Sequence, residues 1–170
     1  MEMVISVGAF MVSLLALYLS HWHQSSKAVL CFNSRLFDCV SERTNRELSY
    51  TFSNTGNQEL YIKDIALLMG PSPLGHLKHD APYLEVPINH LDPFVLKPGE
   101  IRPFTVVHDA AYRPPKESDP NQHRYTILSL EVISANGKRY QVTHDISELG
   151  ATGPDLKNPI WQGVPMGNSI

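Results

Sequence analysis

The amino-acid sequence predicts an all-β protein, an antiparallel β-sandwich of about seven or eight strands preceded by one N-terminal transmembrane helix. Two observations favour the sandwich: short apolar runs with period-two alternation recur after residue 27, and turn signals separate them at regular intervals. A third observation, an uncharged apolar run over residues 3–20, favours the helix. The 170 residues therefore divide into a transmembrane signal-anchor helix (3–20), a sandwich domain (28–147) and a tail rich in proline and glycine (148–170).

The N-terminal run, MVISVGAFMVSLLALYLS, has no charged side chain over its 18 residues. As a helix it would rise ~27 Å, close to the thickness of the hydrocarbon core of a bilayer. A cleaved signal peptide would begin with basic residues and end at a small-x-small site, whereas this chain begins Met-Glu-Met and has no such site. A buried core helix is a third interpretation, disfavoured because the run has no polar face. We therefore expect an uncleaved single span.

The orientation of this span is open to two interpretations. Lys27 and Arg35 follow the span and Glu2 precedes it, which by the positive-inside rule favours a cytoplasmic sandwich. A disulfide in the domain, and the frequency of N-terminal signal anchors that export the domain behind them, favour the opposite side. We expect a single-pass protein of the cell membrane whose C-terminal domain is exported, periplasmic or extracellular, rather than cytoplasmic.

Two cysteines, Cys31 and Cys39, permit one disulfide. Their even separation would place both on one face of a single strand, too far apart to bond. Pairing therefore needs a turn between them, which Asn33, Ser34 and Arg35 could form. The alternative is a pair of buried thiols, which are common core residues.

Period-two alternation is clearest at residues 46–52, where Leu48, Tyr50 and Phe52 face one way and polar side chains face the other. The sequence Asn-Thr-Gly-Asn at 54–57 comes next, and we interpret it as a structural hairpin turn because Asn and Gly tolerate positive φ. The expected strands cover residues 28–32, 36–41, 46–52, 59–68, the two runs on either side of a turn within 94–107, 123–134 and 139–147.

Two further turns carry specific signals. Lys-Pro-Gly-Glu at 97–100 suits a type II turn, with Pro fixing φ and Gly taking positive φ. Ala-Asn-Gly-Lys at 135–138 is an Asn-Gly hairpin signal. Pro103 indicates an edge strand or a bulge. Sheets packed face to face would bury a core made of Tyr50, Phe52, Ile62, Val106, Leu128, Leu130, Val132, Tyr140 and Val142.

The order of these motifs resembles a known family. A short apolar N-terminus followed by F-S-N-T-G-N, L-Y-I-x-x-I, L-K-P-G-E and S-A-N-G-K-R-Y is similar to small bacterial membrane-anchored immunoglobulin-like domains. The resemblance covers residues 3–147 and implies an immunoglobulin-like sandwich. The chain departs from antibody-type domains because it lacks their Cys…Trp…Cys arrangement, so no adhesion or antibody-like function is implied.

Residues 69–93 form the longest connection between expected strands, and they are too apolar for plain disorder. We expect Leu74, Leu77 and Tyr83 to pack on the sandwich or on a partner protein.

The same connection contains His76, His79 and His90, with Met69 at its start. His and Met side chains can ligate copper or zinc, so these residues define an alternative function, a metal-handling envelope domain. The competing interpretation is a set of solvent-exposed loop histidines, because no fixed third ligand is evident.

The tail, residues 148–170, has no strand periodicity, which is typical of a disordered terminus. It nevertheless contains the apolar residues Ile160, Trp161 and Val164, which we take as candidate contacts with the chain's own domain or with a partner. An extended segment along a sheet edge is one form such docking would take.

Charge and motifs exclude several function classes. The formal net charge is −3 and the 14 Lys and Arg residues are scattered, so no nucleic-acid footprint is present. The chain has no G-x-S-x-G, P-loop, dinucleotide fingerprint or H-E-x-x-H motif, so we predict no enzyme, no cofactor and no small-molecule substrate. We predict a non-enzymatic, membrane-anchored binding or scaffolding module, an accessory subunit of a membrane or envelope protein complex with another protein as partner.

Overall fold

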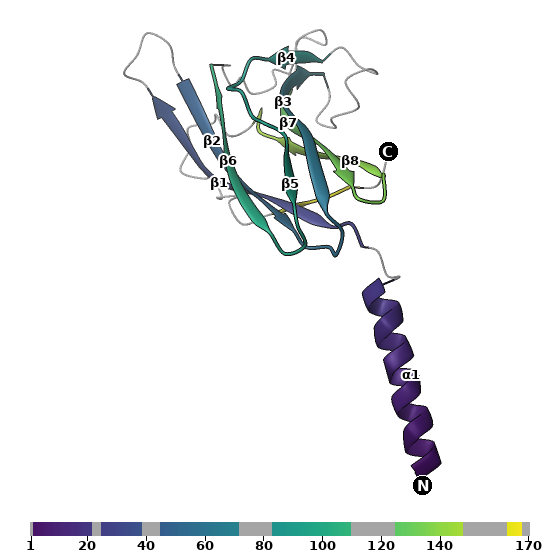
Figure 1. Ribbon diagram of the computed structural model, residues 1–170. Helices are drawn as coiled ribbons and strands as arrows, with labels where there is room; N and C mark the ends of the chain where they lie inside the picture. Colours follow the sequence, from purple (N-terminus) through teal and green to yellow (C-terminus); the bar gives the residue numbers. More distant parts are fainter. Residues whose placement is uncertain are drawn as a thin grey trace.

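The computed structural model describes residues 2–21, 25–38, 45–71, 83–109, 125–147 and 163–167. One helix is followed by two antiparallel β-sheets, and the helix projects away from them (Figure 1). The all-β antiparallel fold is thus as predicted. In chain order the elements are α1 (Glu2–His21), β1 (Ala28–Asp38), β2 (Asn45–Asn54), β3 (Leu60–Gly70), β4 (Leu84–Val86), β5 (Phe94–Leu96), β6 (Ile101–His108), β7 (Tyr125–Ser134), β8 (Arg139–Asp145) and β9 (Val164–Pro165).

The first sheet has four strands in the order β6-β2-β1-β9. β1 and β2 form a long hairpin with Leu30 opposite Phe52, and β6 lies on the other side of β2 with Phe104 opposite Tyr50. β9 pairs with β1 through Val164 opposite Leu30. Pro103 lies on β6, at the end of the sheet order, which confirms the predicted edge position.

The second sheet has five strands, with the path β4-β3-β7-β8 and β5 also pairing with β3. β3 and β7 pair from Leu60–Ser134 to Gly70–Tyr125, with a bulge between Ile62 and Asp64. The region predicted as one long connection, residues 69–93, in fact contains β4, whose three residues sequence patterning did not identify.

The core lies between the two sheets, where the inward side chains of alternating strand positions meet. Leu48, Tyr50 and Phe52 of β2 are completely buried, as their alternation predicted. The whole predicted core is buried, which confirms the predicted faces of these strands: Tyr50, Phe52, Ile62, Val106, Leu128, Leu130, Val132, Tyr140 and Val142.

Two glycines take the positive φ that their turns require. Gly99 has φ 77° and Gly137 has φ 80°, in the Pro-Gly and Asn-Gly turns respectively. Gly56 is different, because it does not have positive φ and is instead needed for space. A Cβ atom there would collide with the backbone of Ser25 and Lys27, which lies against the turn.

The turn at 54–57 has a structural role, but the predicted hairpin is wrong, because β2 and β3 lie in different sheets and no residue of the turn has positive φ. The buried Asn54 side chain donates from Nδ2 to the carbonyl oxygens of Gln58 (2.8 Å) and Leu96 (3.1 Å), and its Oδ1 accepts from the Gly56 N–H (3.0 Å). These bonds satisfy a buried amide and fix the conformation that joins β2 to β3.

The chain does not turn at Asn33, Ser34 and Arg35, where a disulfide between Cys31 and Cys39 would have required a turn. β1 runs continuously through these residues, with only a register shift in its pairing with β2 between Phe32 and Ser34. The extended chain replaces the two predicted strands by one, because the bulge absorbs the break in alternation. Cys31 carries a free thiol. Cys39 lies outside the described residues, and the disulfide loses the turn that it required.

The structure also corrects the prediction of a transmembrane helix. α1 forms over residues 2–21, which includes the predicted 3–20. A span requires about 20 consecutive, predominantly apolar residues. Across the described ranges no helix is both long enough and apolar enough to meet that requirement, so the prediction of a transmembrane segment is wrong. The expected location at the cell membrane rested on that segment.

Candidate functional site

A groove opens beside β3 where its strand pairing is interrupted. On one side of β3, pairing with β5 ends at Ile62, and pairing with β4 begins at Leu67. The chain between β4 and β5, residues 87–93, leaves the sheet at this point, and we call it the strap. The groove between β3 and the strap has a volume of about 530 Å³ and is open to solvent.

The strap is held at the edge of the opposite sheet by one side chain. Asn89 Oδ1 accepts from the Val107 N–H at 2.6 Å, and Asn89 Nδ2 donates to the Thr105 carbonyl at 3.0 Å. The Asn89 N–H also donates to the Val107 carbonyl at 3.1 Å. Ile88 and Leu91 pack against the core from the strap. The strap therefore connects the two sheets, and it forms one wall of a preformed groove.

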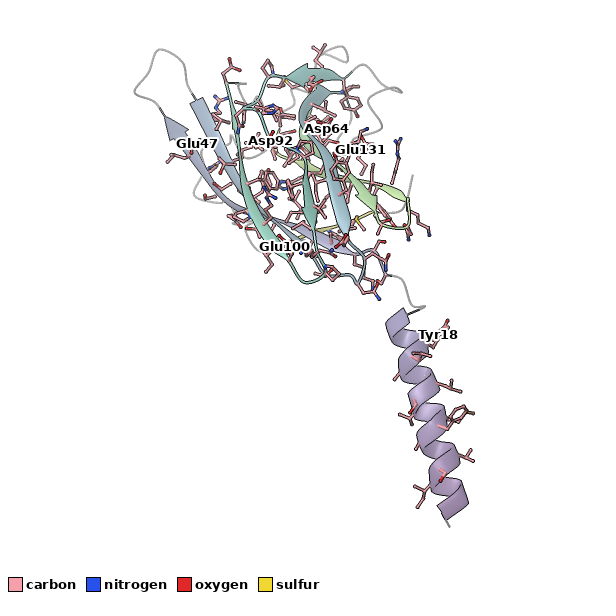
Figure 2. The ribbon with its side chains drawn as sticks, in the orientation of Figure 1. Tyr18, Glu47, Asp64, Asp92, Glu100 and Glu131 are labelled. Atoms are coloured by element: carbon pink, nitrogen blue, oxygen red, sulfur yellow. The ribbon has the colours of Figure 1, made fainter. Side chains whose placement is uncertain are left out.

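Charged side chains of β3 and β4 line the groove. Asp64 lies on β3 and Glu85 on β4, while Lys63 Nζ binds Glu131 at 2.9 and 3.1 Å. Figure 2 shows Asp64 and Glu131 toward the end of the sandwich that lies away from α1.

Of the two predicted metal ligands that the structure describes, Met69 and His90, only His90 lines the groove. Its Nε2 lies 3.0 Å from Asp92 Oδ1, and both side chains are 86% exposed. Met69 points elsewhere, because it packs against the core from β3. His76 and His79 lie outside the described residues. Among the residues that the structure describes, no group of three His, Cys, Asp or Glu side chains could hold a metal ion.

Two of the predicted partner-binding residues contact the chain's own sandwich. The Tyr83 ring lies against Gly70, where a Cβ atom would overlap it, and Val164 is half-buried against the core. The tail thus docks as an extended segment along a sheet edge at 163–167, one of the forms considered. Leu74, Leu77, Ile160 and Trp161 lie outside the described residues.

A buried aromatic cluster connects the two sheets. Tyr50 of β2 and His144 of β8 approach at 3.1 Å between the Tyr50 hydroxyl and the His144 Nδ1. The Tyr50 ring stacks on Phe104 and tilts against Phe32, with ring centroids 5.5 and 5.2 Å apart. Burial lowers the pKa of His144 from its usual value, although Asp145 acts in the opposite direction. The alternation that put His144 on the inward face of its strand was the only sequence signal for this pair.

A second buried histidine lies at the end of β6. His108 faces Arg46 across the β2–β6 pairing and is 3% exposed. Burial and, next, the Arg46 guanidinium lower the pKa of His108 to about 4, against an opposing effect of Asp109. Both interior histidines are therefore neutral at pH 7. Tyr50 is fully buried, whereas the His144 side chain is half-buried.

α1 presents an apolar surface to its surroundings. Its large apolar side chains are 46–68% exposed, in contrast to those of the strands. These residues are Ile5, Val7, Phe10, Met11, Val12, Leu14, Leu15, Leu17 and Tyr18. They lie on all sides of the helix, as the sequence of consecutive apolar residues requires.

No protein-family model matches this chain, and no curated protein matches it. The fold and the geometry of the surfaces described above are therefore the basis for any statement about function.

Proposed function

We propose that this protein is a non-enzymatic binding or scaffolding module that assembles with another protein as an accessory subunit of a complex. The observation that carries the proposal is the exposed apolar surface of α1. Nine large apolar side chains in one helix are each about half or more exposed. Contiguous apolar surfaces of this kind mark interaction sites, whereas single exposed apolar residues need no explanation.

Burial of this surface is strongly favourable. Removing apolar surface from water contributes roughly 25 cal/mol per Å², so each large side chain of α1 that a partner covers contributes about 1–2 kcal/mol. Side chains such as Phe10 and Leu15 would act as anchors, since buried aromatic and apolar groups dominate interface energies. A partner with an apolar groove or helix bundle provides the matching surface.

The sandwich supplies the rigid part of such a subunit. The pKa values of His108 and His144 are lowered, so both are neutral at pH 7, and the turns of the sandwich are fixed by Asn54, Gly99 and Gly137. A rigid domain attached to one apolar contact helix is suited to holding a position within an assembly.

The proposal is tested by photocrosslinking in cells that make the full chain. A benzophenone side chain replaces Phe10 in one variant and Ile101 in a control. Ile101 is a suitable control because its side chain is as exposed as that of Phe10, 64% against 63%, but lies on β6. We expect irradiation to give a discrete protein adduct from position 10 and none from position 101. Absence of a protein adduct from position 10 would overturn the proposal.

A further inference from the structure

We propose that residues 163–167 of one copy of this chain exchange with those of a second copy, so that two copies assemble by swapping this segment. The segment fills a space between β1 and β8, which we call the slot. This site is separate from α1, and the inference goes beyond the function proposed above. It rests on the fit between slot and segment, on the few contacts that retain the segment, and on the length of chain that connects it to β8.

The slot selects its occupant by shape at Gly163. A Cβ atom at this position would overlap Val29 Cγ1 and would lie 3.4 Å from Cys31 Sγ, so a side chain there collides with β1. Val164 and Met166 follow, and both pack against the core. A segment that fits the slot therefore has the pattern Gly-apolar-x-apolar, and every copy of the chain carries this pattern in its own tail.

Few contacts hold the segment in the slot. Among the described residues, its pairing with β1 covers Val164 and Pro165, and the Met166 N–H adds one hydrogen bond to the Ala28 carbonyl at 2.8 Å. The anchoring side chains of Val164 and Met166 are only half-buried. A segment with so few contacts opens more readily than the core strands. Its contacts with a second copy would be the same as those within one chain, so exchange costs little beyond bringing the copies together.

The connection between β8 and the segment is long enough for exchange. Residues 148–162, a run of 15, separate Ser147 from Gly163. A run of that length reaches at most about 50 Å when fully extended. A compact domain of roughly 120 residues has a radius of gyration of about 14 Å. The segment therefore reaches the slot of an adjacent copy while its own β8 stays paired.

Exchange between two copies would also close on itself. In a reciprocal pair each copy gives one segment and receives one, so no slot stays empty. Because the Met166 N–H donates to β1, the neighbouring Pro165 has its backbone nitrogen directed away from β1. A proline nitrogen has no N–H to offer to a further strand, so pairing stops at this edge. The geometry therefore favours a closed dimer over an open polymer.

The test uses two differently tagged copies of the full chain, made together in one cell, both with Cys31→Ser and Cys39→Ser. One copy carries Val29→Cys in β1 and the other carries Pro165→Cys in the segment, positions that lie opposite each other in the pairing. Opposition of this kind brings the two Cα atoms to about 4.5 Å, a separation that a disulfide spans. We expect mild oxidation to give a covalent heterodimer that a reducing agent separates.

The control pair has Ile101→Cys in place of Pro165→Cys. Ile101 is exposed and lies on β6, at the other end of the same sheet. We expect the Pro165→Cys pair to give at least about tenfold more heterodimer on a non-reducing gel, because pairing raises the effective concentration of its two thiols. Equal yields from the two pairs would overturn the proposal, since each segment would then stay in its own slot.

A substitution within the segment tests whether the cross-link depends on the slot. Adding Gly163→Val to the Pro165→Cys copy should reduce the heterodimer to the control yield, because the new side chain collides with β1 of either copy. Adding Gly167→Ala instead should leave the yield unchanged, because its Cβ atom would lie at an ordinary contact distance, 3.6 Å, from the Gln141 carbonyl oxygen. A heterodimer that survives Gly163→Val would refute exchange through the slot.

Discussion

The sandwich interior and helix α1 use the same apolar residue types in opposite ways. Leucines of the interior strands, such as Leu48 and Leu128, are completely buried, whereas Leu14, Leu15 and Leu17 of α1 are 46–58% exposed. In the strands the apolar positions alternate with polar ones, so one face can be buried while the other meets solvent. In α1 they follow one another, so no single face can bury them all.

The difference teaches that apolar content alone does not fix the role of a segment. Alternation lets each strand bury its apolar face within the chain, whereas the exposed apolar side chains of α1 are left for contacts outside the sandwich. Substitutions should therefore affect the stability of the fold in the first region and the assembly of the protein in the second.

The largest expected effect is the loss of stability when a buried leucine of the sandwich, rather than an exposed leucine of α1, is replaced by alanine. Leu128→Ala removes a fully buried side chain from the centre of β7 and should lower the free energy of unfolding by about 2–5 kcal/mol, since it leaves a cavity. Leu15→Ala in α1 should change it by less than about 0.5 kcal/mol. Urea unfolding followed by far-UV circular dichroism measures both. Equal losses in the two variants would mean that α1 belongs to the cooperative sandwich.

The two histidines of the sandwich, His108 and His144, should make its stability depend on pH. In the unfolded chain His108 has its ordinary pKa of 6.5 and becomes protonated below that pH, but burial and Arg46 lower its pKa to about 4 in the folded protein. The unfolded state therefore binds more protons between these values. The contribution of His108 to the free energy of unfolding is fully present above pH 6.5. It is lost as the pH falls towards 4, and the loss amounts to roughly 2–3 kcal/mol.

Comparison of variants isolates this effect from that of the carboxylates. His108→Gln should reduce the loss of stability between pH 6.5 and 5 in chemical denaturation, and His144, with its lowered pKa, retains a contribution of the same sign. His90→Gln is the control for the loss of an exposed imidazole. A His108→Gln curve parallel to the wild type would contradict the assignment.

A smaller effect is expected for the hydrogen bond across the sheets. Tyr50→Phe removes the buried hydroxyl that contacts His144 Nδ1 and leaves this half-buried ring nitrogen without that partner, which should cost about 1–3 kcal/mol. Tyr18→Phe makes the same chemical change on α1, where the side chain is 50% exposed, and should be nearly neutral. Thermal unfolding distinguishes the two. A neutral Tyr50→Phe would show that water or another group replaces the lost bond.

The smallest expected effect concerns the surface of the second sheet. Glu131→Gln removes the ion pair between Glu131 and Lys63. The side chain of Glu131 is 29% exposed and that of Lys63 is 45% exposed. Solvent screens such pairs, so the cost should be about 0–1 kcal/mol and should vanish at high salt. Glu47→Gln is the control for loss of one exposed charge. A loss above about 2 kcal/mol would mean that the pair is coupled to the bulge of β3 between Ile62 and Asp64.

Much of the sandwich could be predicted because each strand carries its own local signal. Alternation identified the buried faces of β2, β7 and β8, and Pro-Gly and Asn-Gly marked two turns whose glycines take positive φ. The continuity of β1 could not be predicted in the same way, since a bulge shifts the side-chain parity in mid-strand. β4 and β9 have only three and two residues, and their pairing depends on distant partners rather than on local pattern.

The candidate site was only partly visible in the sequence. His90 was identified, but as a metal ligand among loop histidines, and its partner in the structure is Asp92. The groove itself depends on where the pairing of β3 stops on one side, which no local pattern records. Asn89 gave no signal either, because a loop asparagine is ordinary until its hydrogen bonds to Thr105 and Val107 are known.

The pairing of β9 with β1 has a consequence for the order of events during synthesis. Leu30 and Val164 face each other across the sheet but are separated by 134 positions in the chain. During synthesis, the edge of β1 that pairs with β9 therefore stays unpaired until residues 164 and 165 have left the ribosome. A nascent chain stalled before residue 163 would expose that edge, and exposed strand edges are templates for pairing with other chains. A pulse-labelled, stalled chain should accordingly depend on chaperones until those few residues are added.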